Sequence, residues 1–201
     1  MDTKAQVDPT PVATPVNRGL KILEIGGNVK PKANLVPGWE GEKILTLDID
    51  PEQKPDIVAD AGHLPEELHG QFDGPFASHV LEHFSYWDTE RVLRGWIDCL
   101  KEGGELHIVV PSWEWTAREV LSEKPSPATL PHSFAGQVNQ WDVHLAMFTM
   151  RNLRRLFDKL GLSLRAAATG KYHINVGDMG IFEAEEHYIA GIKGPPKLRK
   201  E

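Results

Sequence analysis

Five short apolar segments constrain the fold of this chain most strongly. They follow one another at residues 21–25, 43–50, 56–60, 76–80 and 105–111. Four of them end in glycine or polar residues, and the fifth stops at a proline. Segments this apolar are typical of strands that are buried on both faces, as in a parallel sheet covered by helices. The sequence therefore predicts an α/β fold.

Helical spacing of apolar residues appears in two places. The first such segment covers residues 92–100, after Asp88 as a candidate N-cap, and the second begins at Thr149. Two late strands are expected at 162–168 and 187–193, the last of them antiparallel. The alternation of strand and helix predicts a doubly wound, mostly parallel, seven-stranded Rossmann-like sheet with an antiparallel last strand.

Length and composition predict one domain with two tails. The 201 residues suit a domain at 19–193, flanked by a flexible N-terminal tail at 1–18 and a C-terminal tail at 194–201. The net charge of −7 gives no strong nucleic-acid signal, because phosphate binding needs clustered positive charge. With Cys99 as the only cysteine, no signal-like segment and no membrane span, we expect a cytoplasmic protein.

Polar residues collect where the first four predicted strands end. These clusters are Glu24 with Gly26 and Gly27, Asp48 with Asp50, Asp60 to His63, and Ser78 to His83. In open α/β sheets, ligands bind outside the carboxyl ends of the strands, near the switch in strand order. The clusters are therefore the candidate site.

Five of these stretches, in this order and spacing, resemble the class I S-adenosylmethionine-dependent methyltransferases, in particular the small methyltransferase-11-like branch. The matching stretches are LEIGG, VPGWEGEKILTLDIDP, PDIVADAGHLP, FASHVLEHF and VLRGWIDCLKEGGELHIVVPS. The resemblance is continuous over about 20–113 and resumes more loosely in AGQVNQWDVHLAMFTMRNLRRLFDKLGL. It implies a methyltransferase fold, an S-adenosyl-L-methionine cofactor and methyl transfer as the activity.

The resemblance also implies a set of cofactor-binding residues. Gly26 and Gly27 would pass beneath the methionine part, Asp48 would accept from the ribose hydroxyls, and Asp60 from the adenine amino group. Asp50 could replace Asp48 or cap the next turn, and Asp60 could itself be a turn cap. The full predicted set is Glu24, Gly26, Gly27, Asp48, Asp60, Ala61, Ser78 and His79.

Residues 79–83 also spell H-x-x-E-H, the zinc signature of inverted metalloproteases. That signature needs both histidines on one helical face, whereas a strand over 76–80 would separate His79 from His83. The sequence therefore predicts no metal site. His83 and His144 are instead candidate general bases, because imidazole titrates near neutral pH.

Residues 112–148 are predicted to be an acceptor-side insertion or lid, because this stretch is too long for a plain connection. Trp113, His132 and Trp141 within it are candidate substrate-binding residues. The predicted acceptor is a small molecule or a glycan, with O- and N-methylation both open. The alternative is a catalytically silent methyltransferase-like binding or scaffold protein, which binds the cofactor or a protein partner. A nicotinamide oxidoreductase is disfavoured, because G-x-G-x-x-G is absent after Ile25.

Overall fold

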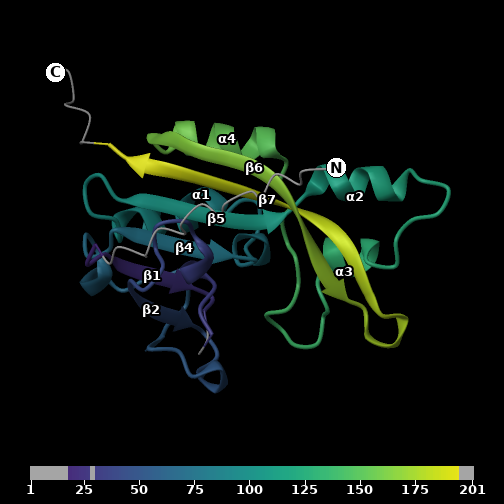
Figure 1. Ribbon diagram of the computed structural model, residues 1–201, viewed down its shortest axis with the longest axis horizontal. Coiled ribbons are helices and arrows are strands. Elements are labelled where there is room, and N and C mark those ends of the chain that lie inside the picture. The colour runs from purple at the N-terminus through teal and green to yellow at the C-terminus, as the bar shows by residue number, and fades with distance from the viewer. Residues whose placement is uncertain (1–17, 28–29, 195–201) are drawn as a thin grey trace, which may run out of the picture.

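The computed structural model of this chain describes residues 18–27 and 30–194 and contains one seven-stranded sheet (Figure 1). The strand order is β3-β2-β1-β4-β5-β7-β6. Strand β7 runs antiparallel to both of its neighbours, β5 and β6, and the other strand pairs are parallel. These features confirm the predicted fold class. The predicted tails lie outside the described residues except at their inner ends, positions 18 and 194. The strands are β1 (Lys21–Ile25), β2 (Lys43–Asp48), β3 (Ile57–Val58), β4 (Gly74–Ser78), β5 (Glu105–Pro111), β6 (Leu162–Asn175) and β7 (Ile181–Lys193).

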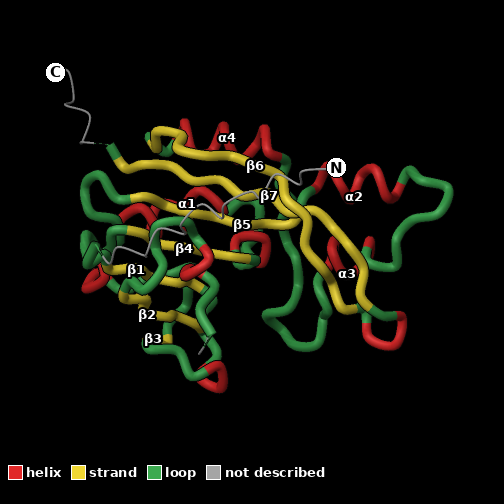
Figure 2. The backbone as a smooth tube through the Cα atoms, viewed as in Figure 1, coloured by secondary structure: helices red, strands yellow, loops and turns green. Residues whose placement is uncertain are grey.

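Helices cover one face of the sheet (Figure 2). Trp96 of α1 and Phe157 of α4 are fully buried there, in one apolar cluster with Leu23 of β1 and Ile108 of β5. Thr149 caps α4 as predicted, because its side chain accepts a hydrogen bond from the Asn152 amide. No α-helix in the described part of the chain is long and apolar enough to cross a membrane. The α-helices are α1 (Thr89–Asp98), α2 (Trp113–Val120), α3 (Thr129–Phe134) and α4 (Met150–Lys159).

The opposite face of β1 and β4 is covered by the described part of the β1–β2 connection instead of an α-helix. Within 30–42 this connection has one 3₁₀ turn, η1 (Ala33–Leu35), which agrees with the helix-breaking effect of its prolines. Trp39 packs so closely on Gly74 that a Cβ atom there would lie 2.2 Å from the indole ring. The second face of β1 and β4 is thus covered by a connection that has little regular secondary structure.

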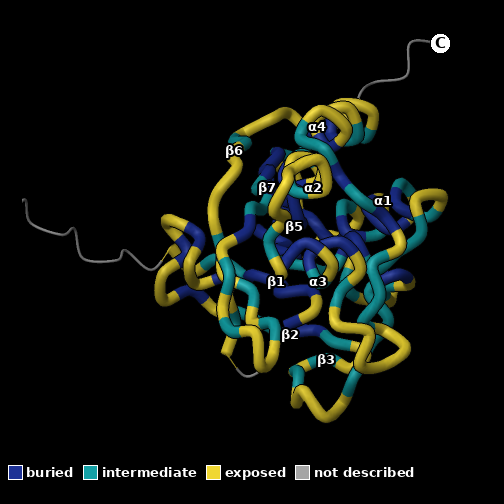
Figure 3. Tube along the Cα trace, turned by 90° about the vertical axis from the view of Figure 1, so that its right-hand side faces the viewer, coloured by how far each residue is buried: buried dark blue, intermediate teal, exposed yellow. Residues whose placement is uncertain are grey.

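Five strands differ from their predicted bounds. Strand β2 ends at Asp48 instead of residue 50, and β3 covers only Ile57–Val58 of the predicted 56–60. Strand β4 ends at Ser78, so His79 lies beyond it, with a φ angle of +57°. Strands β6 and β7 are longer than predicted, and together they extend past the sheet as an arm (Figures 1 and 3). Helices α2 and α3 pack against this arm in a separate small cluster around Trp115. The predicted insertion at 112–148 therefore contains two helices, α2 and α3, that pack against the arm.

Candidate active site

A cavity of about 430 Å³ opens at the carboxyl ends of the central strands. Residues at or just after the ends of β1, β2, β3 and β4 line one side, and residues 140–145 from the segment after α3 line the other. Seven of the residues predicted from sequence are among those that line it: Gly26, Asp48, Asp60, Ala61, His79, His83 and Trp141. The structure thus gathers these residues around one pocket, as expected from the polar strand ends.

The glycine turn after β1 has no room for side chains. Gly26 has a φ angle of +72°, and a Cβ atom there would lie 2.3 Å from Val80 Cγ2. A Cβ atom on Gly27 would lie 2.8 Å from Glu24 Cγ. Both glycine amides donate to the Leu47 carbonyl of β2, at 2.7 and 3.1 Å. The backbone therefore reaches the pocket edge at Gly26 without a side chain in front of it.

Two aspartates lie at the end of β2, Asp48 as its last residue and Asp50 two positions later, and the structure separates their roles. Asp48 lines the pocket, and its Oδ1 accepts a 2.8 Å hydrogen bond from the Asp50 amide. Asp50 caps the turn η2 (Pro51–Gln53), because its side chain accepts from the Glu52 amide at 2.9 Å. Of the two alternatives for Asp50, the structure thus shows the cap.

Asp60 both lines the pocket and caps its own turn. Its Oδ1 accepts from the Gly62 amide at 2.7 Å, and its Oδ2 lies 2.9 Å from His63 Nδ1. Burial would raise the pKa of Asp60, but these two partners outweigh it and hold the pKa below its usual value. Neighbouring Ala61 is fixed by α1, because its carbonyl accepts from Trp96 Nε1 at 2.8 Å.

Two predicted cofactor residues point elsewhere. Glu24 is buried, and its two carboxylate oxygens accept hydrogen bonds from the Lys32 and Ala33 amides at 3.0 and 2.7 Å. It therefore anchors the β1–β2 connection. Ser78 lines a different cavity, of about 470 Å³, together with Tyr172 on the arm.

His79 lies between two carboxylates. Its Nε2 is 3.0 Å from Glu186 Oε2, and its Nδ1 is 3.3 Å from Glu82 Oε1. Burial would lower the pKa of His79, but the two carboxylates outweigh it and raise the pKa to about 9. The imidazole is therefore a cation at neutral pH. Neither glutamate was among the predicted site residues. Glu82 could have been found from the sequence, because it is part of the H-x-x-E-H motif that contains His79. Nothing in the sequence links Glu186 to His79.

The two candidate bases differ in their access to the pocket. His83 is on the turn η4 (Leu81–His83), lines the pocket and makes a 3.1 Å hydrogen bond from Nδ1 to the Val143 carbonyl. His144 lies behind it, and its Nδ1 is 3.1 Å from the His132 carbonyl. Burial is the main cause that lowers the pKa of His144. His83 is thus the one of the two that lines the pocket.

Two predicted substrate-binding residues lie away from the pocket. His132 is buried beside Trp115, with a ring centroid distance of 4.5 Å. Its Nε2 donates to the Glu185 carbonyl at 2.9 Å, and its Nδ1 lies 2.8 Å from the Thr116 hydroxyl. Burial lowers the pKa of His132 to about 4. Trp113 is half-exposed at the start of α2. His132 belongs to the layer that supports the arm, and both residues line a separate small cavity beside Glu82 and His144.

The fold and the strand-end pocket define an α/β protein of the nucleotide-binding type, and sequence comparison gives its family. Residues 7–167 match a family described as a methyltransferase domain. The chain belongs to this family and is an S-adenosylmethionine-dependent methyltransferase, which confirms the predicted family, activity and cofactor. No curated protein sequence matches the chain significantly.

Solved structures share the fold at low sequence identity. A Bacillus halodurans protein assigned to the methyltransferases has a TM-score of 0.62 at 12% identity, over 90% of this chain and 96% of that one. A SAM-dependent methyltransferase from Methanosarcina mazei has a TM-score of 0.62 at 17% identity, over 94% and 99%. The Burkholderia thailandensis 1,6-didemethyltoxoflavin-N1-methyltransferase, with 1,6-didemethyltoxoflavin and S-adenosylhomocysteine bound, has 0.56 at 14%, over 89% and 72%.

Proposed function

We propose that this enzyme transfers the methyl group of S-adenosylmethionine to a small-molecule or glycan acceptor held in the pocket at the strand ends. The observation that carries the proposal is the convergence of Gly26, Asp48 and Asp60 on one cavity from three separate strand ends. A volume of about 430 Å³ is within the range of small-molecule sites.

The residues of the pocket fit the cofactor. A carboxylate can accept from two hydroxyls at once, which suits Asp48 to a ribose. Asp60 and the Ala61 backbone would face the adenine, and the glycine turn at Gly26 would leave space for the methionine part. Bound there, the cofactor supplies an electrophilic methyl group on a sulfonium. Glu24, Gly27 and Ser78 are not among the residues that line this pocket, and their contacts with the cofactor remain predictions.

The acceptor would enter from the side formed by residues 140–145. Trp141 offers an aromatic surface there, and the amide of Leu145 donates to the Glu82 carbonyl at 2.7 Å. This hydrogen bond ties the predicted acceptor-side segment to the turn that carries His83. Positioning and exclusion of water would then do most of the catalytic work, because methyl transfer needs in-line alignment.

His83 is the proposed general base for an acceptor that must lose a proton. Since its Nδ1 donates to a carbonyl, a neutral ring carries its lone pair on Nε2. Small-molecule acceptors are supported by the Burkholderia enzyme of the same fold, which binds 1,6-didemethyltoxoflavin. A protein partner is proposed only for the catalytically silent alternative.

The test is methyl transfer from isotopically labelled S-adenosylmethionine to pools of phenols, amines, sugars and oligosaccharides, read by mass spectrometry. We expect labelled product from at least one pool with the unaltered chain, and none with Asp48→Ala. Fragmentation of the product distinguishes O- from N-methylation. Cofactor binding without transfer to any pool would contradict the proposal and favour the silent alternative.

A further inference from the structure

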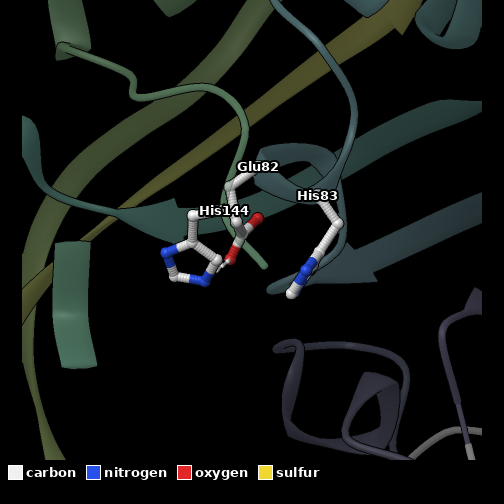
Figure 4. A group of neighbouring side chains, drawn as sticks. All are labelled: Glu82, His83 and His144. Atoms are coloured by element: carbon white, nitrogen blue, oxygen red, sulfur yellow. Dashed lines mark ion pairs between the residues drawn. The ribbon is translucent and has the colours of Figure 1, made fainter. Parts of the chain in front are cut away.

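A cluster of three potential metal ligands lies beside the pocket (Figure 4). Glu82 and His83 come from η4, and His144 comes from the segment after α3. One ligand atom from each, a carboxylate oxygen or a ring nitrogen, lies within 4.8 Å of the others. The rings of His83 and His144 meet edge to face, with their centroids 5.0 Å apart.

Hydrogen bonds fix the tautomer of both histidines. The Nδ1 atoms of His83 and His144 each lie 3.1 Å from a backbone carbonyl oxygen, which can only accept. Nδ1 therefore carries the proton in each neutral ring, and the lone pair is on Nε2. Metal-binding histidines are held in the same way, with the second ring nitrogen donating to a carbonyl or carboxylate.

The Glu82 carboxylate is buried without a hydrogen-bonding partner. Its residue is 1% exposed, and neither oxygen accepts a hydrogen bond from any group in the described ranges 18–27 and 30–194. His79 Nδ1 lies 3.3 Å from Oε1 but is not in hydrogen-bonding geometry with it. The same oxygen faces His144 Nε2 at 3.8 Å. When His144 carries its proton on Nδ1, its Nε2 atom is an acceptor that faces a second acceptor, Glu82 Oε1. A cation between these two atoms would satisfy both.

We propose that Glu82, His83 and His144 form a binding site for a divalent transition-metal ion of the zinc class. Two imidazoles and one carboxylate suit such an ion better than Mg²⁺, which prefers oxygen ligands. Metal–ligand bonds of about 2.0–2.2 Å would draw the three ligand atoms together by roughly 1 Å from their present positions. Three protein ligands leave at least one coordination position open, as in catalytic zinc sites.

The open position would adjoin the acceptor side of the pocket, because His83 belongs to both the cluster and the pocket wall. A metal ion there would bind an acceptor through an oxygen, such as a hydroxyl group. This substrate class rests on the proposed methyltransferase function, whereas the metal site itself does not. With a metal ion bound, His83 would act as a ligand, and its proposed role as general base would be confined to the metal-free enzyme.

The direct test is a titration of the EDTA-treated, dialysed full-length chain with Zn²⁺ by calorimetry, with Mg²⁺ in excess. Co²⁺ is added in a parallel sample, because its visible absorption reports coordination. We expect one equivalent of Zn²⁺ to bind per chain. The variants are Glu82→Gln and His144→Gln, and the matched control is His173→Gln, at an exposed histidine of β6.

Loss of a ligand should weaken Zn²⁺ binding by more than the roughly 100-fold that loss of an outer hydrogen bond can cost. His173→Gln should bind Zn²⁺ like the unaltered chain. Circular dichroism establishes that each variant is folded, and His83→Gln replaces Glu82→Gln if the latter does not fold. Absence of a one-equivalent site in the folded chain would overturn the proposal. Unchanged Zn²⁺ affinity in His144→Gln would do the same.

A second titration separates this proposal from the proposed function. The same metal-free samples are titrated with S-adenosylhomocysteine. Zn²⁺ binding without cofactor binding would support the metal site and contradict the proposed cofactor pocket. Cofactor binding without Zn²⁺ binding would contradict the metal site and leave the cofactor pocket standing.

Discussion

His79 Nε2 lies 3.0 Å from Glu186 Oε2, which joins the end of β4 to the arm strand β7. The two residues are 107 positions apart in the chain. Because His79 lines the pocket, this ion pair connects the arm to the proposed cofactor site. His79 itself has a left-handed backbone conformation, which non-glycine residues seldom adopt.

Glu186→Gln should destabilise the folded protein by about 1 kcal/mol, since a charge-assisted hydrogen bond of a partly buried pair is weakened. Glu183→Gln on the same strand is the control. Glu183 pairs with Lys171 at 2.6 Å, but both side chains are exposed, and exposed pairs contribute little. Urea unfolding measures both free energies. An equal effect of the two substitutions would contradict a specific role for the His79–Glu186 pair.

Gly26→Ala should lower stability by about 1–3 kcal/mol and weaken cofactor binding. The substitution adds a Cβ atom 2.3 Å from Val80 Cγ2 at a φ angle of +72°, so it forces both a clash and backbone strain. Gly170→Ala is the control, because nothing lies within 4 Å of its added Cβ atom. Adding Val80→Ala should remove the clash but not the strain. Thermal unfolding compares these three variants with the unaltered chain. Equal stability losses in Gly26→Ala and Gly170→Ala would contradict the predicted clash and strain at Gly26.

The contacts of the Asp73 carboxylate predict that the folded protein loses stability in acid. Its Oδ2 accepts from the Lys21 amide at 2.8 Å and from Lys101 Nζ at 2.7 Å. Burial would raise the pKa of Asp73, but these partners outweigh it and lower the pKa. The stabilisation of the folded state by ionised Asp73 is therefore fully present above the unfolded pKa of about 3.9. It disappears as the pH falls through the lower pKa of the folded state.

Asp73→Asn should thus cost about 1 kcal/mol at pH 7 and progressively less below pH 4. Exposed Asp98→Asn is the matched control and should change stability little at either pH. Unfolding curves from pH 3 to pH 7 give the comparison. A penalty for Asp73→Asn that stayed constant across this range would contradict the assigned ion pair.

Strand positions were predictable where the apolar run was continuous and sharply ended. Strands β1 and β5 have the predicted bounds, 21–25 and 105–111, because glycine follows one and proline ends the other. The outer parts of β6 and β7 were not predicted. They form a partly exposed two-stranded arm in which polar and apolar residues mix, so no buried-strand pattern marks them.

The pocket could be predicted in part for the same reason. Asp48 ends β2 and Asp60 follows β3, and residues at the ends of parallel strands meet at one edge of the sheet. Glu24 lies inside β1 and Ser78 ends β4. Because alternate side chains of a strand point to opposite faces, a position near a strand end does not by itself place a side chain in the pocket. The pairing of His79 with Glu186 depends on tertiary structure and leaves no local signal.

The most direct test of the central claim is calorimetric titration with S-adenosylmethionine and, separately, S-adenosylhomocysteine. The unaltered chain is compared with Asp48→Ala and Asp50→Ala. Both aspartates lie at the end of β2, but only Asp48 is among the residues that line the pocket. We expect the unaltered chain and Asp50→Ala to bind both compounds, and Asp48→Ala to bind about 100-fold more weakly through loss of charge-assisted hydrogen bonds. Unchanged affinity in folded Asp48→Ala, or no binding to the folded unaltered chain, would contradict the assignment of this pocket to the cofactor.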